Sequence, residues 1–232
     1  MTTAHPSTAP NQESARSDGR GSAPPSPPSG RRSNRWPRRI AITLAVLGAL
    51  ACAAWLGLRW ITPYPYSGTV MQAPTAAPSM DGLVLSDGTP LDIADFDGEL
   101  LLVYFGYTSC PDVCPTTLSQ VAAARRRLGG DADRVQLLMI SIDPERDSLD
   151  VLGDYVTSFD PSFIAATGDL PDVERVAAQY GIFFAKGEAL GDGYAVDHTA
   201  TLMGIDPDGH LRIIWPAQLD VERLAADFDE LL

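Results

Sequence analysis

The sequence lacks several features on which large protein classes depend. Its three cysteines in 232 residues are too few for a small domain held together by a disulfide framework. Residues 61–232 hold 9 basic residues against 28 acidic ones, so this part has no clustered lysine and arginine with which to bind nucleic acid. A single long apolar run, at residues 40–58, excludes a protein with several membrane spans. One membrane segment and one soluble, acidic domain are therefore expected.

The first 60 residues have the opposite charge balance, with 8 arginines against two acidic residues. Residues 1–39 begin with a stretch rich in Ser, Pro, Ala and Gly, which predicts a disordered cytoplasmic tail. Ile40–Leu58 carries no charge and spans about 28 Å as a helix, so a transmembrane anchor is predicted at residues 40–60. Arginines gather before this run. They predict a single-pass protein of the cytoplasmic membrane, with its N-terminus inside and its C-terminal domain in the periplasm or extracytoplasmic space.

Two alternatives stay open for this segment, a cleaved signal peptide and a lipoprotein signal that ends at Cys52. The apolar run is long for a signal peptide, and Ala49, three positions before the cysteine, fits a lipoprotein cleavage site poorly. In an uncleaved anchor, Cys52 is a small apolar residue within the lipid. Residues 61–79 contain four prolines and are predicted to form a linker.

Residues 80–232 are predicted to form one α/β domain. Leu100–Phe105 and Val135–Ile142 are continuous apolar runs, typical of strands buried on both faces. Between them, Cys114–Leu128 has the spacing of a helix, which predicts a strand-helix-strand unit with a parallel pair. The end of the chain has a turn signal between two apolar runs and then an amphipathic helix. A mixed sheet flanked by helices is expected, with parallel strands first and antiparallel strands later.

Cys110 and Cys114 directly follow the first buried strand, where the helix begins. Residues four apart lie on one face of a helix, so the two thiols are expected close together. Cys114 faces the positive end of the helix dipole, which predicts a lowered thiol pKa. A thiolate acts as a nucleophile or as a soft metal ligand, and outside the membrane the pair can also form a disulfide. A purely structural disulfide is disfavoured, because closing so small a loop removes little entropy.

His198 is the third candidate, between the glycine-rich loop Gly187–Gly193 and a predicted strand. His5 lies in the tail and His210 in a predicted turn, so both are expected to be solvent-exposed. Two thiolates and one imidazole suit Cu(I) and can hold Cu(II) with an added ligand. Zinc accepts the same ligands together with water, so the spacing alone leaves the metal open.

One further segment and three single residues have more modest interpretations. Asp143–Asp147 closes a buried strand, and both a helix cap with a surface ion pair and a place near the site stay open. Asp197 is a candidate acceptor that would orient the imidazole of His198. Met139 and Met203 fall in predicted strands and are expected in the core rather than as copper ligands.

The motifs together resemble those of the Sco/SenC family. The resemblance is carried by Val103–Leu118, which contains Cys-Pro-Asp-Val-Cys, by Ser141–Asp147, and by Asp197–Thr199 followed by Ile205–Gly209. It covers roughly residues 82–232. The family comprises membrane-anchored copper chaperones with a thioredoxin fold that act in cytochrome oxidase assembly. The resemblance implies a thioredoxin-like domain in which Cys110, Cys114 and His198 bind copper and the two cysteines also form a redox pair.

A rival function exists within the same fold. Thiol-disulfide oxidoreductases of the thioredoxin type use Cys-x-x-Cys opposite a cis-proline. This chain has one more residue between its cysteines and no proline between Pro171 and Pro207, and His198 stands where that proline is expected. Metal handling is therefore favoured over general disulfide exchange.

The expected function is a membrane-anchored copper chaperone. The resemblance implies delivery of copper to the binuclear copper centre of cytochrome c oxidase subunit II or a related acceptor, with a periplasmic copper donor or a thiol reductant as a further partner. The alternatives are a thiol-disulfide reductase that maintains the cysteines of that acceptor, and a redox or copper sensor. The sequence leaves open whether the chain is also an enzyme.

Overall fold

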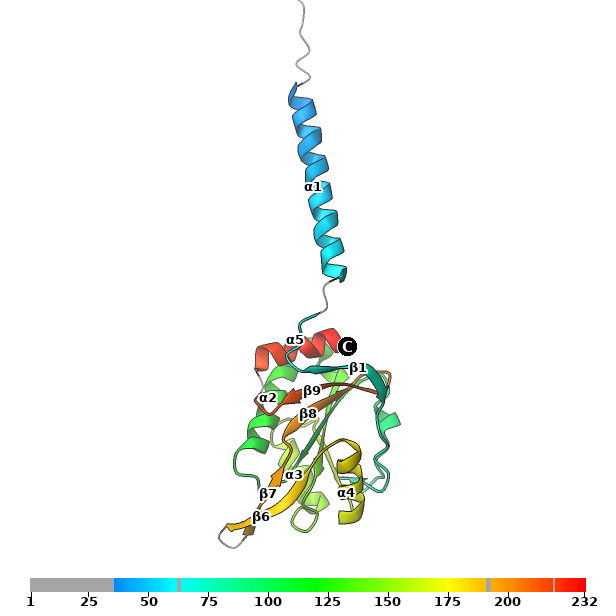
Figure 1. Cartoon of the computed structure of the whole chain (residues 1–232). Coiled ribbons are helices and arrows are strands. Elements are labelled where there is room, and N and C mark those ends of the chain that lie inside the picture. Colours follow the sequence, from blue (N-terminus) through cyan, green and yellow to red (C-terminus); the bar gives the residue numbers. More distant parts are fainter. Residues whose placement is uncertain (1–35, 62–63, 191–192, 219) are drawn as a thin grey trace, which may run out of the picture. The chain divides into compact units, whose positions relative to one another are not determined.

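The computed structural model describes residues 36–61, 64–190, 193–218 and 220–232. The chain divides into two units, residues 1–63 and 64–232. In the first unit, helix α1 covers Trp36–Ile61, and its stretch Trp36–Gly57 is long and apolar enough to cross a membrane (Figure 1). Apart from residues 36–39, which are helical, the predicted disordered tail lies outside the described residues.

The second unit is a mixed sheet covered by helices (Figure 1). Its strand order is β1-β9-β8-β3-β4-β5-β2, and β3, β4 and β5 run parallel while the other neighbours are antiparallel. The strands are β1 Thr69–Ala76, β2 Val84–Leu85, β3 Leu100–Gly106, β4 Val135–Ser141, β5 Ile164–Thr167, β8 Thr201–Ile205 and β9 His210–Pro216. The predicted parallel first part and antiparallel second part are confirmed.

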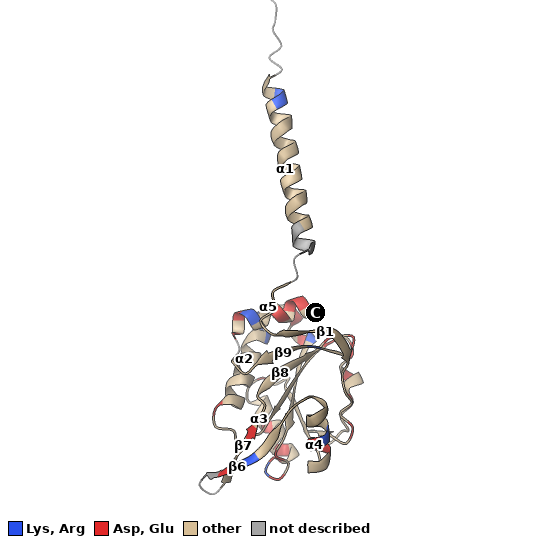
Figure 2. Cartoon of the chain, viewed as in Figure 1, with Lys and Arg blue, Asp and Glu red and all other residues tan. Residues whose placement is uncertain are grey.

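Four α-helices and two short 3-10 helices complete the described part of this unit. They are α2 Val113–Arg127, α3 Leu149–Thr157, α4 Leu170–Gln179, α5 Val221–Leu231, η1 Ile93–Phe96 and η2 Gly129–Arg134. Two more strands, β6 Phe184–Leu190 and β7 Gly193–His198, form a separate two-stranded ribbon. This ribbon occupies most of the segment that the sequence suggests is a glycine-rich loop. Acidic positions outnumber basic ones over these elements (Figure 2).

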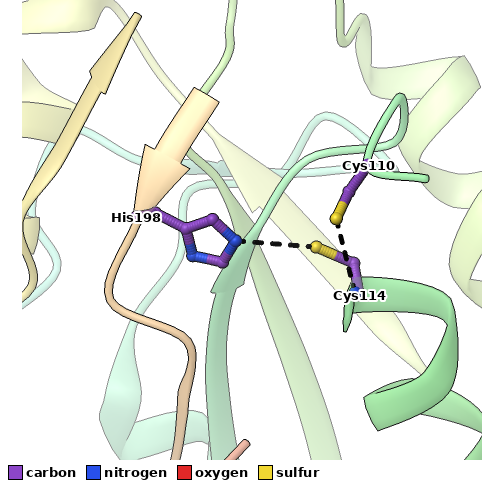
Figure 3. Close-up of side chains that lie close together, drawn as sticks. All are labelled: Cys110, Cys114 and His198. Atoms are coloured by element: carbon purple, nitrogen blue, oxygen red, sulfur yellow. Dashed lines mark hydrogen bonds between the residues drawn. The ribbon is translucent and has the colours of Figure 1, made fainter. Parts of the chain in front are cut away.

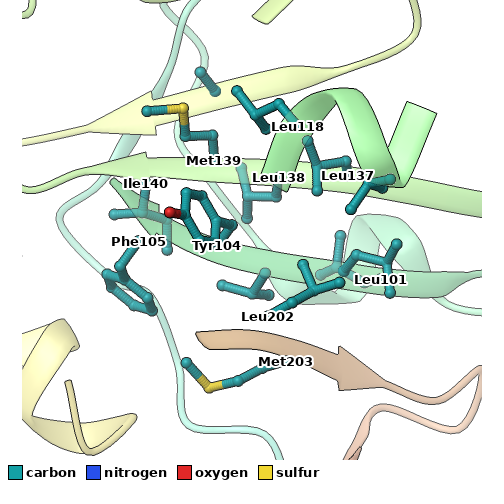
Figure 4. Close-up of a cluster of buried hydrophobic side chains, with 14 of the residues drawn as sticks. Leu101, Tyr104, Phe105, Leu118, Leu137, Leu138, Met139, Ile140, Leu202 and Met203 are labelled. Carbon is teal, nitrogen blue, oxygen red and sulfur yellow. The ribbon is translucent and has the colours of Figure 1, made fainter. Parts of the chain in front are cut away.

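The core surrounds β3, whose seven residues are all buried. Successive side chains of a strand point to opposite faces of the sheet, so the side chains of Tyr104 and Phe105 lie on opposite faces. The Tyr104 hydroxyl reaches the first turn of α2, whereas the Phe105 ring lies 5.8 Å from that of Tyr180 at the end of α4. Met139 and Met203 lie in this core, as predicted (Figure 4).

Strand β1 is a difference from the sequence-based prediction, which places residues 69–76 in a linker. The strand pairs with β9 at the edge of the sheet, and its register shifts between Val70 and Thr75, around Pro74. An edge strand with an irregularity tolerates proline, because no ladder hydrogen bond is needed there. The domain therefore begins before residue 80, at the described residues from Tyr64 onward.

A buried carboxylate fixes the chain just before β1. Asp227 of α5 accepts hydrogen bonds from the Trp215 indole nitrogen at 2.8 Å, from the Ser67 backbone nitrogen at 3.0 Å, and from the Ser67 hydroxyl. Gly68 packs so closely beneath Trp215 that a Cβ at this position would lie 2.7 Å from the indole ring. The segment around Ser67 is thus an integral part of the domain.

Candidate metal centre

The two cysteines are positioned by the turn from β3 into α2. Cys110 lies in the connecting loop, where its backbone nitrogen donates to the Tyr107 carbonyl oxygen at 3.3 Å. Cys114 lies in the first turn of α2, and its backbone nitrogen donates to Cys110 Sγ at 3.5 Å (Figure 3). The first backbone N–H groups of a helix have no partner within the helix, so the sulfur of Cys110 satisfies one of them. Both thiols are free.

Cys114 is enclosed by the core. Its side chain is fully buried, and the Tyr104 hydroxyl donates to its Sγ at 3.5 Å. Gly106, the last residue of β3, leaves room for this sulfur: a Cβ there would lie 2.8 Å from the Tyr104 ring and 3.1 Å from Cys114 Sγ. The absence of a side chain at residue 106 is therefore part of how the thiol is accommodated.

Gly106→Ala is expected to lower the free energy of unfolding by about 1–3 kcal/mol, because an added methyl group overpacks a buried site. The measurement is urea unfolding followed by circular dichroism. Gly130→Ala is the matched control, since a Cβ at residue 130 meets nothing within 4 Å. Equal stabilities of the two variants would contradict the tight contact at Gly106.

His198 ends strand β7 and turns its ring toward the thiols (Figure 3). Its Nε2 lies 3.8 Å from Cys114 Sγ, and its Nδ1 lies 3.3 Å from the Thr199 carbonyl oxygen. The rings of Tyr104 and Tyr107 meet the imidazole edge to face, with centroids at 6.4 and 5.9 Å. Asp197, considered as an acceptor for this ring, is exposed.

The three predicted ligands come together in the fold. One ligand atom from each of Cys110, Cys114 and His198 lies within 4.8 Å of the other two. A trigonal ion with metal–ligand distances of about 2.0–2.3 Å places its ligand atoms about 3.5–4 Å apart, so a small contraction would bring the three onto one ion. Soft thiolates and an imidazole match copper, and the cluster fits a copper ion.

The thiols share one proton unequally. Hydrogen bonding from the Cys114 thiol is the largest cause that lowers the pKa of Cys110, and His198 and the Cys114 backbone N–H act in the same direction. The same hydrogen bond, together with burial, raises the pKa of Cys114. The sequence-based expectation of a lowered pKa at Cys114 is reversed, because the helix N-terminus points its N–H at Cys110 and Cys114 is buried.

A surface cavity of about 340 Å³ opens onto the site. Its lining is largely apolar, with one thiol, one imidazole and two carboxylates: Tyr107, Cys110, Pro111, Asp112, Val113, Ala195, Val196, Asp197, His198 and Ala200. The site is therefore reachable from outside.

The other two histidines and the third cysteine are not part of this cluster. His5 is outside the described residues, and His210 begins β9 directly after the predicted turn, with its Nδ1 3.5 Å from Asp206 Oδ1. Cys52 is exposed on α1. Sequence reasoning missed Tyr104 and Tyr107, although a hydroxyl in or next to a continuously apolar strand signals a buried polar partner.

Comparison with known proteins decides the family. A sequence profile described as SCO1/SenC matches residues 80–232, which contain all three clustered candidate ligands. The chain belongs to the SCO1/SenC family. Among curated Sco relatives, the mitochondrial protein SCO2 homolog of Mus musculus is 36% identical over 125 residues, covering 53% of this chain and 49% of the relative. The mitochondrial protein SCO1 homolog of Homo sapiens is 39% identical over 118 residues, covering 50% and 39%. The chain thus spans half or less of the length of these relatives.

Solved Sco structures share the fold. Bradyrhizobium japonicum ScoI with copper bound has a TM-score of 0.60 and 33% identity, covering 69% of this chain and 98% of that one. Apo Sco1 from Thermus thermophilus has a TM-score of 0.64 and 33% identity, covering 73% and 98%. BsSco, described as a member of the Sco family of cytochrome c oxidase assembly proteins, is 17% identical with a TM-score of 0.53, which shows the fold alone. The predicted thioredoxin-like fold is confirmed.

Proposed function

We propose that this protein is a copper chaperone that binds one copper ion through Cys110, Cys114 and His198. It delivers the ion to the binuclear copper centre of cytochrome c oxidase subunit II. The observation that carries the proposal is the cluster of two thiol sulfurs and one imidazole nitrogen within 4.8 Å of one another, beside an open cavity. The copper bound to ScoI of Bradyrhizobium japonicum supports the choice of metal. Membership of the SCO1/SenC family supports the acceptor, because the Sco family is described as one of cytochrome c oxidase assembly proteins.

Transfer by ligand exchange follows from the donor set. Two thiolates and one imidazole leave a position on the ion for an incoming ligand, whereas a structural site with four protein ligands is closed. The cavity supplies the path by which ligands of an acceptor reach this position. A copper donor or a thiol reductant outside the membrane would load the site or keep its thiols reduced.

In the proposed arrangement, α1 anchors the chain in the cytoplasmic membrane with the domain outside. The arginines before the apolar run support an N-terminus that stays inside. Anchoring restricts the domain to the membrane surface and raises its effective concentration near a membrane-bound acceptor. Protease treatment of intact spheroplasts tests the topology, because digestion of the domain requires it to lie outside.

The test of copper binding is the metal content of the reduced full-length chain in detergent, offered equal amounts of copper and zinc. We expect one copper per chain, with thiolate-to-copper charge transfer in the Cu(II) form. Loss of a residue that only orients a metal ligand lowers metal affinity by up to about 100-fold. A larger loss of Cu(II) affinity is expected for each ligand variant, namely Cys110→Ser, Cys114→Ser and His198→Ala. Absence of copper from the unsubstituted chain, or retention of zinc instead, would refute the proposal.

A thiol-disulfide reductase is the second candidate, favoured by the unequal thiols. The Cys110 thiolate would attack a disulfide of the acceptor and form a mixed disulfide, releasing one acceptor thiolate. The released acceptor thiolate would take the proton of the Cys114 thiol, and the Cys114 thiolate would then attack Cys110 Sγ. This second attack releases the other acceptor thiolate, which leaves a disulfide in this chain and two reduced cysteines in the acceptor. Full reductase activity of His198→Ala, together with no copper bound by the unsubstituted chain, would favour this function over the chaperone. A copper or redox sensor would need the same site and a binding surface.

A further inference from the structure

His198 is carried by an element that stands apart from the main sheet. Within the described residues, β6 and β7 pair with each other alone, whereas both cysteines follow β3 in the centre of the seven-stranded sheet. The main sheet reaches this end of the chain only after His198, where Leu202 of β8 pairs with Tyr104 of β3, so it fixes the distance between the imidazole and the thiols only in part. Contacts between loops and side chains have to set it.

Arg146 and Asp143, in the loop after β4, hold the ribbon. Arg146 Nη1 donates to the Tyr194 carbonyl oxygen at 2.9 Å, and its guanidinium carbon lies 3.8 Å from the centroid of the Tyr194 ring. The buried carboxylate of Asp143 accepts from the Tyr194 hydroxyl at 2.7 Å and also pairs with Arg146 Nε. Tyr194 lies in β7 four residues before His198, so these bonds fix the ribbon close to the ligand.

Asp147, in the same loop, holds the cysteine segment. Its buried carboxylate accepts from the Thr108 backbone nitrogen at 3.0 Å, from Thr108 Oγ1 at 2.5 Å, and from Ser141 Oγ at 2.6 Å. Thr108 lies two residues before Cys110. Both interpretations of this loop apply in part, because it lies near the site and its Glu145 also forms an exposed ion pair with Lys186. The loop is bonded at one end to the ribbon that carries His198 and at the other to the segment that carries the cysteines.

We propose that Asp143, Arg146 and Asp147 form a positioning clamp that holds His198 at ligand distance and thereby determines which oxidation state of copper the site retains. Two thiolates suffice for Cu(I), whereas Cu(II) favours nitrogen and oxygen ligands and depends on the imidazole. A loosened ribbon therefore weakens Cu(II) binding selectively. This inference rests on the copper-binding function proposed above.

The test compares Arg146→Met with the unsubstituted full-length chain in detergent. Methionine keeps an apolar side chain of similar reach but loses the ion pair and the bond to Tyr194. We expect Cu(II) affinity to fall about 10–100-fold, as for other residues that orient a metal ligand, while Cu(I) affinity stays unchanged. In the copper-free protein, amide hydrogen exchange should accelerate in residues 193–198 and stay unchanged in β3 and β4.

Two further variants make the result decisive. Tyr194→Phe removes only the hydroxyl group. If Arg146→Met does not fold, the same copper affinities and exchange rates are measured on Tyr194→Phe. Glu145→Gln is the matched control: Glu145 pairs with Lys186 at 2.6 Å between the same loop and the same ribbon, but both side chains are more than half exposed. Exposed pairs contribute little, so this variant should behave like the unsubstituted protein.

Equal losses of Cu(I) and Cu(II) affinity, or unchanged exchange at residues 193–198, would overturn the clamp. Failure of the proposed copper-binding function can be told apart from failure of the clamp, because the unsubstituted chain would then bind no copper. The exchange comparison needs no metal and decides in either case whether the loop holds the ribbon.

Discussion

Cys110 is expected to react with iodoacetamide at nearly the same rate at pH 5 and at pH 8. Hydrogen bonds from the Cys114 thiol, from His198 and from the Cys114 backbone lower the pKa of Cys110 far below its usual range, so the thiolate already predominates at pH 5. An ordinary thiol with a pKa near 8.5 reacts about 700-fold faster at pH 8 than at pH 5, because its thiolate fraction grows by that factor. Because the pKa is lowered, reactivity is lost only as the pH falls toward the lowered value.

The rate is measured on the reduced, copper-free chain by quenching and tandem mass spectrometry. No arginine or lysine lies between Arg59 and Arg125, so both cysteines fall on one tryptic peptide and must be located by fragmentation. Cys114→Ala removes the largest cause of the shift and should restore a rate that rises with pH. A rate that already rises with pH across this range in the unsubstituted chain would contradict the shared proton.

The second large effect is expected on stability at Asp227. Asp227→Ala leaves the buried Trp215 indole nitrogen and the Ser67 backbone nitrogen without their acceptor. An unsatisfied buried donor costs about 1–3 kcal/mol, and the part-buried Ser67 nitrogen costs less than the buried indole nitrogen, so the free energy of unfolding should fall by about 2–4 kcal/mol. This is a large share of the 5–15 kcal/mol by which domains are typically stable.

Urea unfolding measures this loss, and Asp229→Ala on the exposed side of the same helix is the control. Asp227→Asn keeps one acceptor oxygen and should lose less than the alanine variant. Equal stabilities of Asp227→Ala and Asp229→Ala would show that Asp227 does not hold the segment before β1.

Local pattern predicted the central elements and the three side chains that the fold brings together. The apolar runs at β3 and β4 and the helical spacing of α2 are strong signals, and the three candidate ligands meet as the resemblance implied. The ribbon β6–β7 was missed, because glycines at 187, 191 and 193 break the alternation that indicates a strand. Strand β1 was missed because Pro74 argues against a strand and is tolerated only at an irregular sheet edge.

The pKa shifts of the two thiols could not be predicted from the cysteine motif, because they depend on where the helix begins. A helix dipole acts on whichever group its first N–H bonds approach, and that depends on the residue at which the helix begins. Because α2 begins at Val113, the N–H of Cys114 points at the sulfur of Cys110. The bonds from Asp143, Arg146 and Asp147 to the site join residues far apart in the sequence, so periodicity could not reveal them.

The three candidate ligands differ in how far they are reached from outside. Cys110 and His198 line the cavity, whereas Cys114 is fully buried among core residues. If the proposed copper transfer takes place, a donor group of an acceptor that enters through the cavity would meet Cys110 and His198 before Cys114. Cys114 would then be the last residue to release the ion, which would keep a protein ligand throughout the exchange.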